Sequence, residues 1–315
     1  MESIMSGKKH HKGDKHHKTK SSKSIIKKTG KRDISIITKS AVKIAEKLNA
    51  SVIIIFSEKL PEISTHIPVL VFTGRKLAMV NQFSRYIDDS DKTLYEKMED
   101  RTRSEVRDIS DASVIAFINN LLEVEGLVVG IISMKDNDSI IVYDLSTNDV
   151  IKQLRECTER ADTRVIKAIL NIALEIAMQG REGKMFGTGF IIGDSDEVMR
   201  RSHQLVLNPF EGQPEENCDI VNPESWETVK SFAQLDGVFV VTESGEIKAA
   251  GRYLDINARD VPVEKGLGGR HASAAAITRD TETIAITVSS SGGIIRVFKD
   301  ALEIIKIEPD IMMVQ

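Results

Sequence analysis

The stretch LDGVFVV, residues 235–241, decides the interpretation of the fold, and the rest of the chain can be read outward from it. Its apolar residues lead to a Glu-Ser-Gly-Glu turn at 243–246 and then to a second run that ends near Leu254. Two such runs on either side of a short glycine-containing turn are typical of a β-hairpin. We therefore expect a hairpin that carries the Asp236 carboxylate at the start of its first strand.

A glycine-rich segment follows this hairpin, and residues 266–276 read GLGGRHASAAA. The glycines let the backbone come close to a ligand, and the alanines favour a helix. Arg270, His271 and Ser273 then lie at a helix N-terminus, where free N–H groups and the helix dipole attract an anion. We expect a buried strand at 283–288, with Ser289 at its end, and a last strand at 294–298.

These features combine one carboxylate, one Gly-Gly-Arg-His helix start and one serine-rich strand end. A carboxylate suits a divalent cation, a helix start suits phosphates, and hydroxyl groups suit the remaining phosphate oxygens. The residues therefore predict a nucleotide site, although this chemistry does not name the nucleotide.

The order of three motifs carries a resemblance to a known family. Asp236-Gly237-Val238, then residues 269–273, then Val288-Ser289, with residues 247–254 between the first two, resemble the diadenylate cyclase (DAC) domain. That family carries an Asp-Gly-Ala motif, an Arg-His-Arg motif and a serine after the following strand. The resemblance covers roughly residues 150–305, and it is to the archaeal-type members, which have a pyruvate-kinase-C-terminal-like domain in front.

The chain departs from the family pattern at three places. Val238 stands at the alanine, Ala272 at the second arginine, and Ser290-Ser291 at the acidic pair that often follows the serine. Loss of the second arginine removes a phosphate contact. We expect that Arg252, Lys265 or a neighbouring subunit replaces this contact, or that turnover is weaker.

The resemblance implies a mixed central β-sheet flanked by helices and a reaction that joins two ATP into cyclic di-AMP (c-di-AMP) with release of two pyrophosphates. It implies Mg²⁺ or Mn²⁺ on Asp236, and a homo-oligomer in which two sites face each other, so that the 3′-hydroxyl of one ATP meets the α-phosphorus of the other. Tyr253 and Leu254 are open to two interpretations, as an adenine platform or as core residues. The implied catalytic residues are Asp236, Arg270 and His271, and the implied nucleotide-binding residues are Gly237, Tyr253, Leu254, Gly268, Gly269, Ser273 and Ser289.

The length of 315 residues predicts about two domains, and a basic tail precedes them. Residues 1–32 hold eleven Lys and Arg against two acidic residues, so the rest of the chain carries a net charge of −13. Such a Lys/His-rich segment has almost no apolar content, and we expect it to be disordered. A solvated tail and a partner-binding arm are both compatible with it.

Helical spacing at 35–48 and short apolar runs at 51–56, 67–72, 126–132 and 139–143 predict a small α/β domain over residues 33–147. Further helices are expected at 75–86 and, with a break, at 93–122. The element order resembles the C-terminal domain of pyruvate kinase, which implies a regulatory or oligomerisation role.

Residues 148–315 are assigned to the DAC domain. The apolar stripe after Asn148-Asp149 predicts one long helix that reaches Gln179. The chain then predicts a first core strand at 187–192 and a short helix at 224–235 that leads to Asp236.

Composition limits the class of protein. Two cysteines are too few for a disulfide framework, and no apolar run approaches the length of a membrane span, so we expect a cytoplasmic protein without membrane contact. Two alternatives to the cyclase remain open. One is a silent sensor that binds ATP or c-di-AMP without processing it, and the other, less expected, is a nucleic-acid-binding protein that uses the basic tail.

Overall fold

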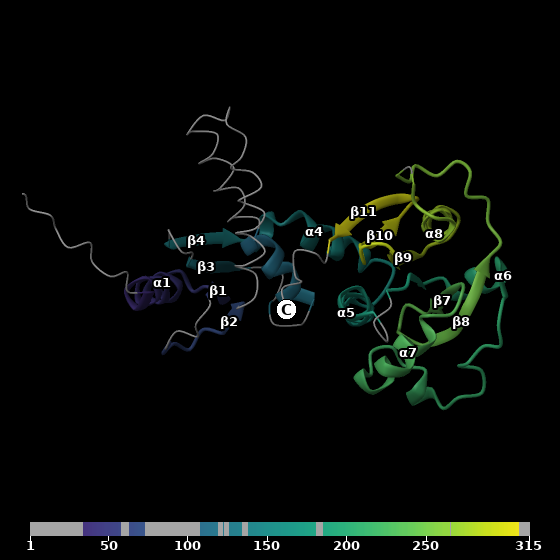
Figure 1. The fold of residues 1–315 in the computed structure, drawn as a ribbon, viewed down its shortest axis with the longest axis horizontal. Coiled ribbons are helices and arrows are strands. Elements are labelled where there is room, and N and C mark those ends of the chain that lie inside the picture. Colours follow the sequence, from purple (N-terminus) through teal and green to yellow (C-terminus); the bar gives the residue numbers. More distant parts are fainter. Residues whose placement is uncertain are drawn as a thin grey trace, which may run out of the picture. The chain divides into compact units, whose positions relative to one another are not determined.

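The computed structural model of the protein describes residues 34–57, 63–72, 108–118, 122, 126–133, 138–180, 185–264 and 266–308 (Figure 1). Within these residues the strands form a four-stranded and a seven-stranded sheet. No helix of the described residues combines the length and the apolar character needed to cross a bilayer. The basic tail and the helix expected at 75–86 lie outside the described residues.

The four-stranded sheet has the order β2-β1-β3-β4. Strand β1 is parallel to β2 and to β3, whereas β4 is antiparallel to β3. Its members are β1 (Val52–Phe56), β2 (Val69–Phe72), β3 (Leu127–Ser133) and β4 (Asp138–Asp144).

Helices cover both faces of this first sheet. On one face, Ala41 and Ala45 of α1 (Ile34–Leu48) pack in a cluster with Ile53 of β1. On the other, Ile109 of the helical segment 108–118 lies so close to Gly130 of β3 that a Cβ there would be 2.3 Å from its Cδ1. The expected α/β organisation is confirmed for the described residues, while the domain boundary at 147 and the resemblance to pyruvate kinase stay predictions.

The seven-stranded sheet has the order β11-β10-β9-β5-β7-β8-β6. Only the central pair β5 and β7 is parallel among its described pairs, and the neighbours of that pair run antiparallel to it. The sheet is therefore mixed, as the resemblance implies. Its members are β5 (Thr188–Ile192), β6 (Ser202–Gln204), β7 (Val238–Val241), β8 (Ile247–Leu254), β9 (Ile284–Val288), β10 (Ile295–Lys299) and β11 (Leu302–Ile307).

Alternation along β9 shows how the two faces of this sheet are filled. Ile284 and Ile286 join the larger core cluster, which includes α5 (Thr163–Gln179), whereas Ala285 joins the cluster that includes α8 (Gly269–Asp280). Figure 1 shows α5 and α8 on either side of β9. Three shorter helices complete the domain, namely α4 (Asp149–Cys157), α6 (Ser195–Arg200) and α7 (Trp226–Phe232).

Two elements differ from the sequence-based expectation. The long helix expected at 149–179 is two helices, α4 and α5, because Asp162 caps a new helix by accepting from the Arg164 N–H. The apolar stripe continues through the break and therefore hides it. The strand expected to be last is followed by β11, which is reached through a turn with positive φ at Asp300 and Ala301.

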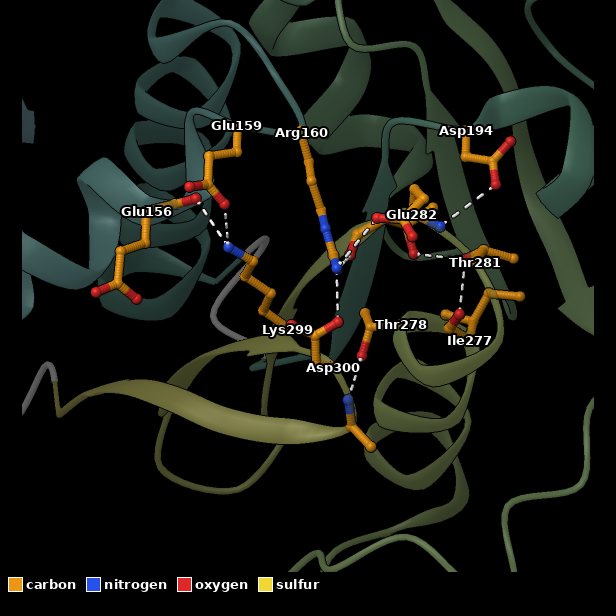
Figure 2. A network of polar contacts seen from close by, with 12 residues as sticks. Glu156, Glu159, Arg160, Asp194, Ile277, Thr278, Thr281, Glu282, Lys299 and Asp300 are labelled. Atoms are coloured by element: carbon orange, nitrogen blue, oxygen red, sulfur yellow. Dashed lines mark hydrogen bonds and ion pairs between the residues drawn. The ribbon is translucent and has the colours of Figure 1, made fainter.

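A polar network fixes the C-terminal end of α8 against the α4–α5 connection (Figure 2). The Arg160 guanidinium donates to the Thr283 carbonyl at 2.9 Å and pairs with Asp300 at 2.6 Å. Lys299 Nζ binds the Glu156 carbonyl at 3.0 Å. The Ala301 N–H, in the turn between β10 and β11, donates to Thr278 Oγ1 of α8 at 3.1 Å, so this end of the helix is linked to the same turn.

Candidate functional site

The Asp236-Gly237 corner is shaped by a close approach to β8. Gly237 has φ +100°, and a Cβ at this position would lie 2.6 Å from the Arg252 carbonyl oxygen. Only glycine tolerates both the backbone conformation and the contact. The corner leaves the Asp236 side chain 94% exposed. The backbone conformation and the contact with β8 therefore explain why position 237 is glycine, independently of any nucleotide.

The start of α8 is open. Gly268 precedes the first turn with extended backbone and no side-chain cap, so a ligand rather than a side chain can use the free N–H groups. A Cβ added at Gly266, Gly268 or Gly269 would meet nothing within 4 Å. These glycines are not needed for packing, and the space beside them is available to a bound anion.

Arg270, in the first turn of α8, lies close to the Asp236-Gly237 corner. Its Nη1 donates to the Gly187 carbonyl at 2.8 Å, and its Nη2 lies 3.9 Å from Asp236 Oδ1. Burial lowers the pKa of this guanidinium and the Asp236 carboxylate opposes that effect, so the group stays cationic at neutral pH. The structure therefore brings together the acid and the helix start that the sequence predicts to share one ligand.

His271 lies deeper than the sequence suggests. It is 7% exposed, and neither ring nitrogen has a hydrogen-bond partner within the described residues. Burial, followed by the charges of Arg296 and Arg270, lowers its pKa to about 4. The imidazole is therefore neutral at physiological pH.

The serine-rich end of β9 borders the same place. A Cβ at Gly187 would lie 3.0 Å from Arg270 Nη1, 3.0 Å from the Val288 carbonyl and 3.1 Å from the Ser290 N–H. Ser289 is 8% exposed, and its Oγ lies 3.3 Å from Ser291 Oγ. The serine-rich end of β9 and Arg270 are thus neighbours.

Three other residues of the expected site have different placements. Leu254 is 4% exposed and belongs to the core cluster on the α8 side, which favours the core interpretation. Tyr253 is 52% exposed, with its ring centroid 5.3 Å from that of His203. Ser273 is half-buried on α8. Their roles, like those of the other expected site residues, stay predictions.

The structure excludes one candidate for the group that replaces the second arginine of the motif. Arg252 is already engaged, because its Nε donates to Ser202 Oγ at 3.0 Å and its Nη2 to the Met199 carbonyl at 2.7 Å. Lys265 lies outside the described residues.

Sequence reasoning missed four residues that surround Arg270 and His271. Gly187 and Gly189 on the β5 side make room for the Arg270 side chain. Thr287 and Arg296 are polar residues inside the apolar strands β9 and β10, and both are buried. The sequence could have indicated Thr287 and Arg296, because each is a polar residue at an inward position of a buried strand.

The donor set for a metal ion is small. The described part of the chain contains no group of three or more His, Cys, Asp or Glu side chains that could hold a metal. Mg²⁺ in nucleotide enzymes is bound by one or two carboxylates together with substrate phosphates and water. The exposed Asp236 carboxylate fits the role of one such ligand.

Two family models match the chain. Residues 175–302 match the family described as DisA bacterial checkpoint controller nucleotide-binding, or DAC. Residues 36–146 match a family described as probable sensor domain DacZ_A. Residues 175–302 are therefore similar to the DAC family, which confirms the resemblance drawn from the motifs in this part of the chain.

Curated relatives agree with the family match. The chain is 40% identical over 175 residues to the diadenylate cyclase of Methanocaldococcus jannaschii, an alignment over 55% of each chain. It is 37% identical over 179 residues to the diadenylate cyclase of Haloferax volcanii, over 57% of this chain and 62% of the relative. The alignments thus span little more than half the length of these relatives.

A solved structure of DacA from Staphylococcus aureus, a double mutant, matches 48% of this chain and 86% of its own at 19% identity and a TM-score of 0.31. A protein from Bacillus cereus, described as a hypothetical membrane spanning protein, matches 85% of this chain and 90% of its own at 14% identity and a TM-score of 0.37.

Proposed function

We propose that the protein is a diadenylate cyclase that joins two ATP molecules into c-di-AMP and releases two pyrophosphates. The DAC match over residues 175–302 and the two relatives named diadenylate cyclase support this function. The observation that carries it is the 3.9 Å approach of Arg270 to Asp236 beside the open start of α8.

In this proposal the residues of the site mainly align and neutralise phosphates. Arg270 and the first N–H groups of α8 bind phosphate oxygens, and the serine rim at Ser289 supplements them. His271, being neutral, offers one N–H. A Mg²⁺ or Mn²⁺ ion on Asp236 would supply further charge neutralisation. Alignment and charge stabilisation are the usual contributions of a protein to transfer at phosphorus.

The reaction also requires two sites. The 3′-hydroxyl of one ATP must lie in line with the α-phosphorus of the other, and each chain offers one Asp236–Arg270 site in its described residues. The proposal therefore includes a homo-oligomer in which two DAC domains face each other. The sensor-type match of residues 36–146 supports a regulatory role for the first domain.

Incubation of the full chain with ATP and Mn²⁺ or Mg²⁺, followed by chromatography of the nucleotides, tests the function. We expect c-di-AMP from the wild type and none from Asp236→Asn, because the amide is a weak metal ligand. Glu243→Gln is the matched control, since Glu243 lies in the turn at the other end of the β7–β8 hairpin.

Normal product formation by Asp236→Asn would contradict the metal role of that residue. If the wild type binds ATP or c-di-AMP and forms no product, the proposed cyclase function is wrong, and the silent nucleotide sensor replaces it.

A further inference from the structure

Three residues form a row across the sheet beneath the first turn of α8. Gly189 on β5 is paired with Thr287 on β9, which is paired in turn with Arg296 on β10. Directly opposite residues project to the same face of a sheet. A Cβ at Gly189 would lie 3.7 Å from Arg270 Cδ, so this is the face that the start of α8 covers.

Polar groups in this place are buried and unpartnered. Thr287 is 0% exposed, Arg296 3% and His271 7%. Within the described residues, Thr287 Oγ1, Arg296 Nη1 and both ring nitrogens of His271 have no hydrogen-bond partner. Buried polar groups in native proteins are nearly always paired. Several exceptions side by side are typical of a binding site rather than of a core.

Arg296 is the charged member of this group, and two carboxylates approach it. Its Nε lies 3.0 Å from Glu303 Oε2 on the neighbouring strand β11. Its Nη2 lies 3.5 Å from Glu264 Oε2, in the loop that leads to Gly266 and α8. The Glu264 side chain is 63% exposed, so this second pair is in contact with water and only weakly held. The carboxylate that contacts Nη2 therefore comes from the segment that leads into the open glycines.

We propose that Arg296 is a second phosphate-binding arginine of this site, and that Glu264 occupies its Nη2 edge until the triphosphate of a bound nucleotide displaces the carboxylate. The inference rests on the proposed function and deepens it. Phosphate offers a guanidinium a bidentate partner of higher charge than a carboxylate.

The departure from the family motif gives this role a reason. The motif places its second arginine at the position of Ala272, whose methyl group cannot bind phosphate. Arg252 is held by Ser202 and Met199 and does not replace it. Arg270 from the helix and Arg296 from the sheet would approach the phosphates from two elements. The replacement comes from β10 rather than from α8.

Equilibrium binding of ATP to the full chain, measured by titration calorimetry, tests the proposal. We expect Arg296→Gln to weaken ATP binding about tenfold or more, because a charge-assisted phosphate contact is lost. Glu264→Gln should tighten ATP binding about threefold, since the competing carboxylate is gone. In the double variant, the Glu264 change should have no effect. AMP, which lacks the β- and γ-phosphates, should show smaller effects of both changes.

Controls separate a phosphate contact from a structural role. Arg279→Gln removes an arginine from the exposed C-terminal end of the same helix, where it pairs with Asp280, and should leave ATP affinity unchanged. Arg296→Lys keeps the buried positive charge and should retain part of the affinity. Thermal unfolding verifies that each variant is folded, and the exposed Glu264 can be changed even if Arg296→Gln does not fold.

Unchanged ATP affinity in both Arg296→Gln and Glu264→Gln would overturn the inference. Weaker ATP binding by Glu264→Gln would overturn it as well. If the wild type forms c-di-AMP and Arg296→Gln binds ATP normally, the inference fails while the proposed function stands. If neither the wild type nor the variants form c-di-AMP but their ATP affinities change as expected, the cyclase function is wrong and the phosphate-binding role of Arg296 stands.

Discussion

The polar side chains at the two ends of helix α8 differ in their hydrogen bonding. At the C-terminal end, Thr281 Oγ1 donates to the Ile277 carbonyl at 2.6 Å, and Thr278 Oγ1 accepts from the Ala301 N–H at 3.1 Å. At the N-terminal end, buried groups of His271 and Arg296 have no hydrogen-bond partner within the described residues. The threonine hydroxyls at one end of the helix are paired, whereas these buried polar groups at and beneath its other end are not.

This difference separates stability from function within one element. Unpaired buried polar groups cost about 1–3 kcal/mol each, so a protein keeps them where they serve a ligand. The network around Arg160 at the other end offsets part of this cost by fixing α8 to the sheet and to the α4–α5 connection (Figure 2). Changes at the two ends should therefore have different consequences.

The largest effect should follow from Arg270→Met at the N-terminal end. Methionine keeps the apolar stem over Gly189 but removes the charge, and we expect c-di-AMP formation to fall at least about 100-fold. The free energy of unfolding should change little, because the lost hydrogen bond is offset by the removal of a partly buried charge. Product formation and urea unfolding measure the two quantities. A normal rate would contradict the comparison, and Arg279→Met is the control.

The next effect concerns pH and His271. Its pKa is lowered from 6.5 to about 4 in the folded protein, so between these values the unfolded chain binds a proton that the folded chain does not. The contribution of neutral His271 to the free energy of unfolding is therefore fully present above about pH 6.5. It is lost as the pH falls toward 4, by at most about 3 kcal/mol. Replacement by glutamine should make the pH dependence shallower by up to that amount, as urea unfolding at pH 7, 6 and 5 would measure.

Arg160→Met tests the C-terminal end. The substitution leaves the Thr283 carbonyl without its donor and removes the pairs with Asp300 and Glu282. Because both carboxylates are mostly exposed, we expect a loss of about 2 kcal/mol in the free energy of unfolding. ATP affinity at a temperature where the variant is folded should be unchanged. A large change in affinity without loss of stability would show that the two ends are not separate in their roles.

The smallest effects should have opposite signs. Thr281→Val removes a paired hydroxyl at the C-terminal end and should destabilise the protein by about 1 kcal/mol. Thr287→Val removes an unpaired buried hydroxyl under the N-terminal end and should be neutral or stabilising by up to about 1 kcal/mol. Urea unfolding of both variants tests the comparison. Equal destabilisation by the two changes would contradict it.

Local patterns predicted much of the second domain. The period-2 runs around 243–246 identified β7 and β8, and the Gly-Gly-Arg-His-Ala order identified the start of α8 at Gly269. They failed at Asp162, because an apolar stripe that crosses a helix break looks the same as one continuous helix. They also failed at β11, since the Asp300-Ala301 turn contains no glycine although both residues have positive φ.

The sequence by itself determined the elements, the motif order and the residues with the chemistry of a nucleotide site, because backbone preferences and short-range spacing are local properties. Only the tertiary structure decided that Arg270 reaches Gly187 and Asp236, that His271 is neutral, and that Arg296 lies beneath the start of α8. These facts depend on which strand stands beside which and in what register. Strand order and register are set by packing between segments that are distant in the chain, and no local pattern contains them.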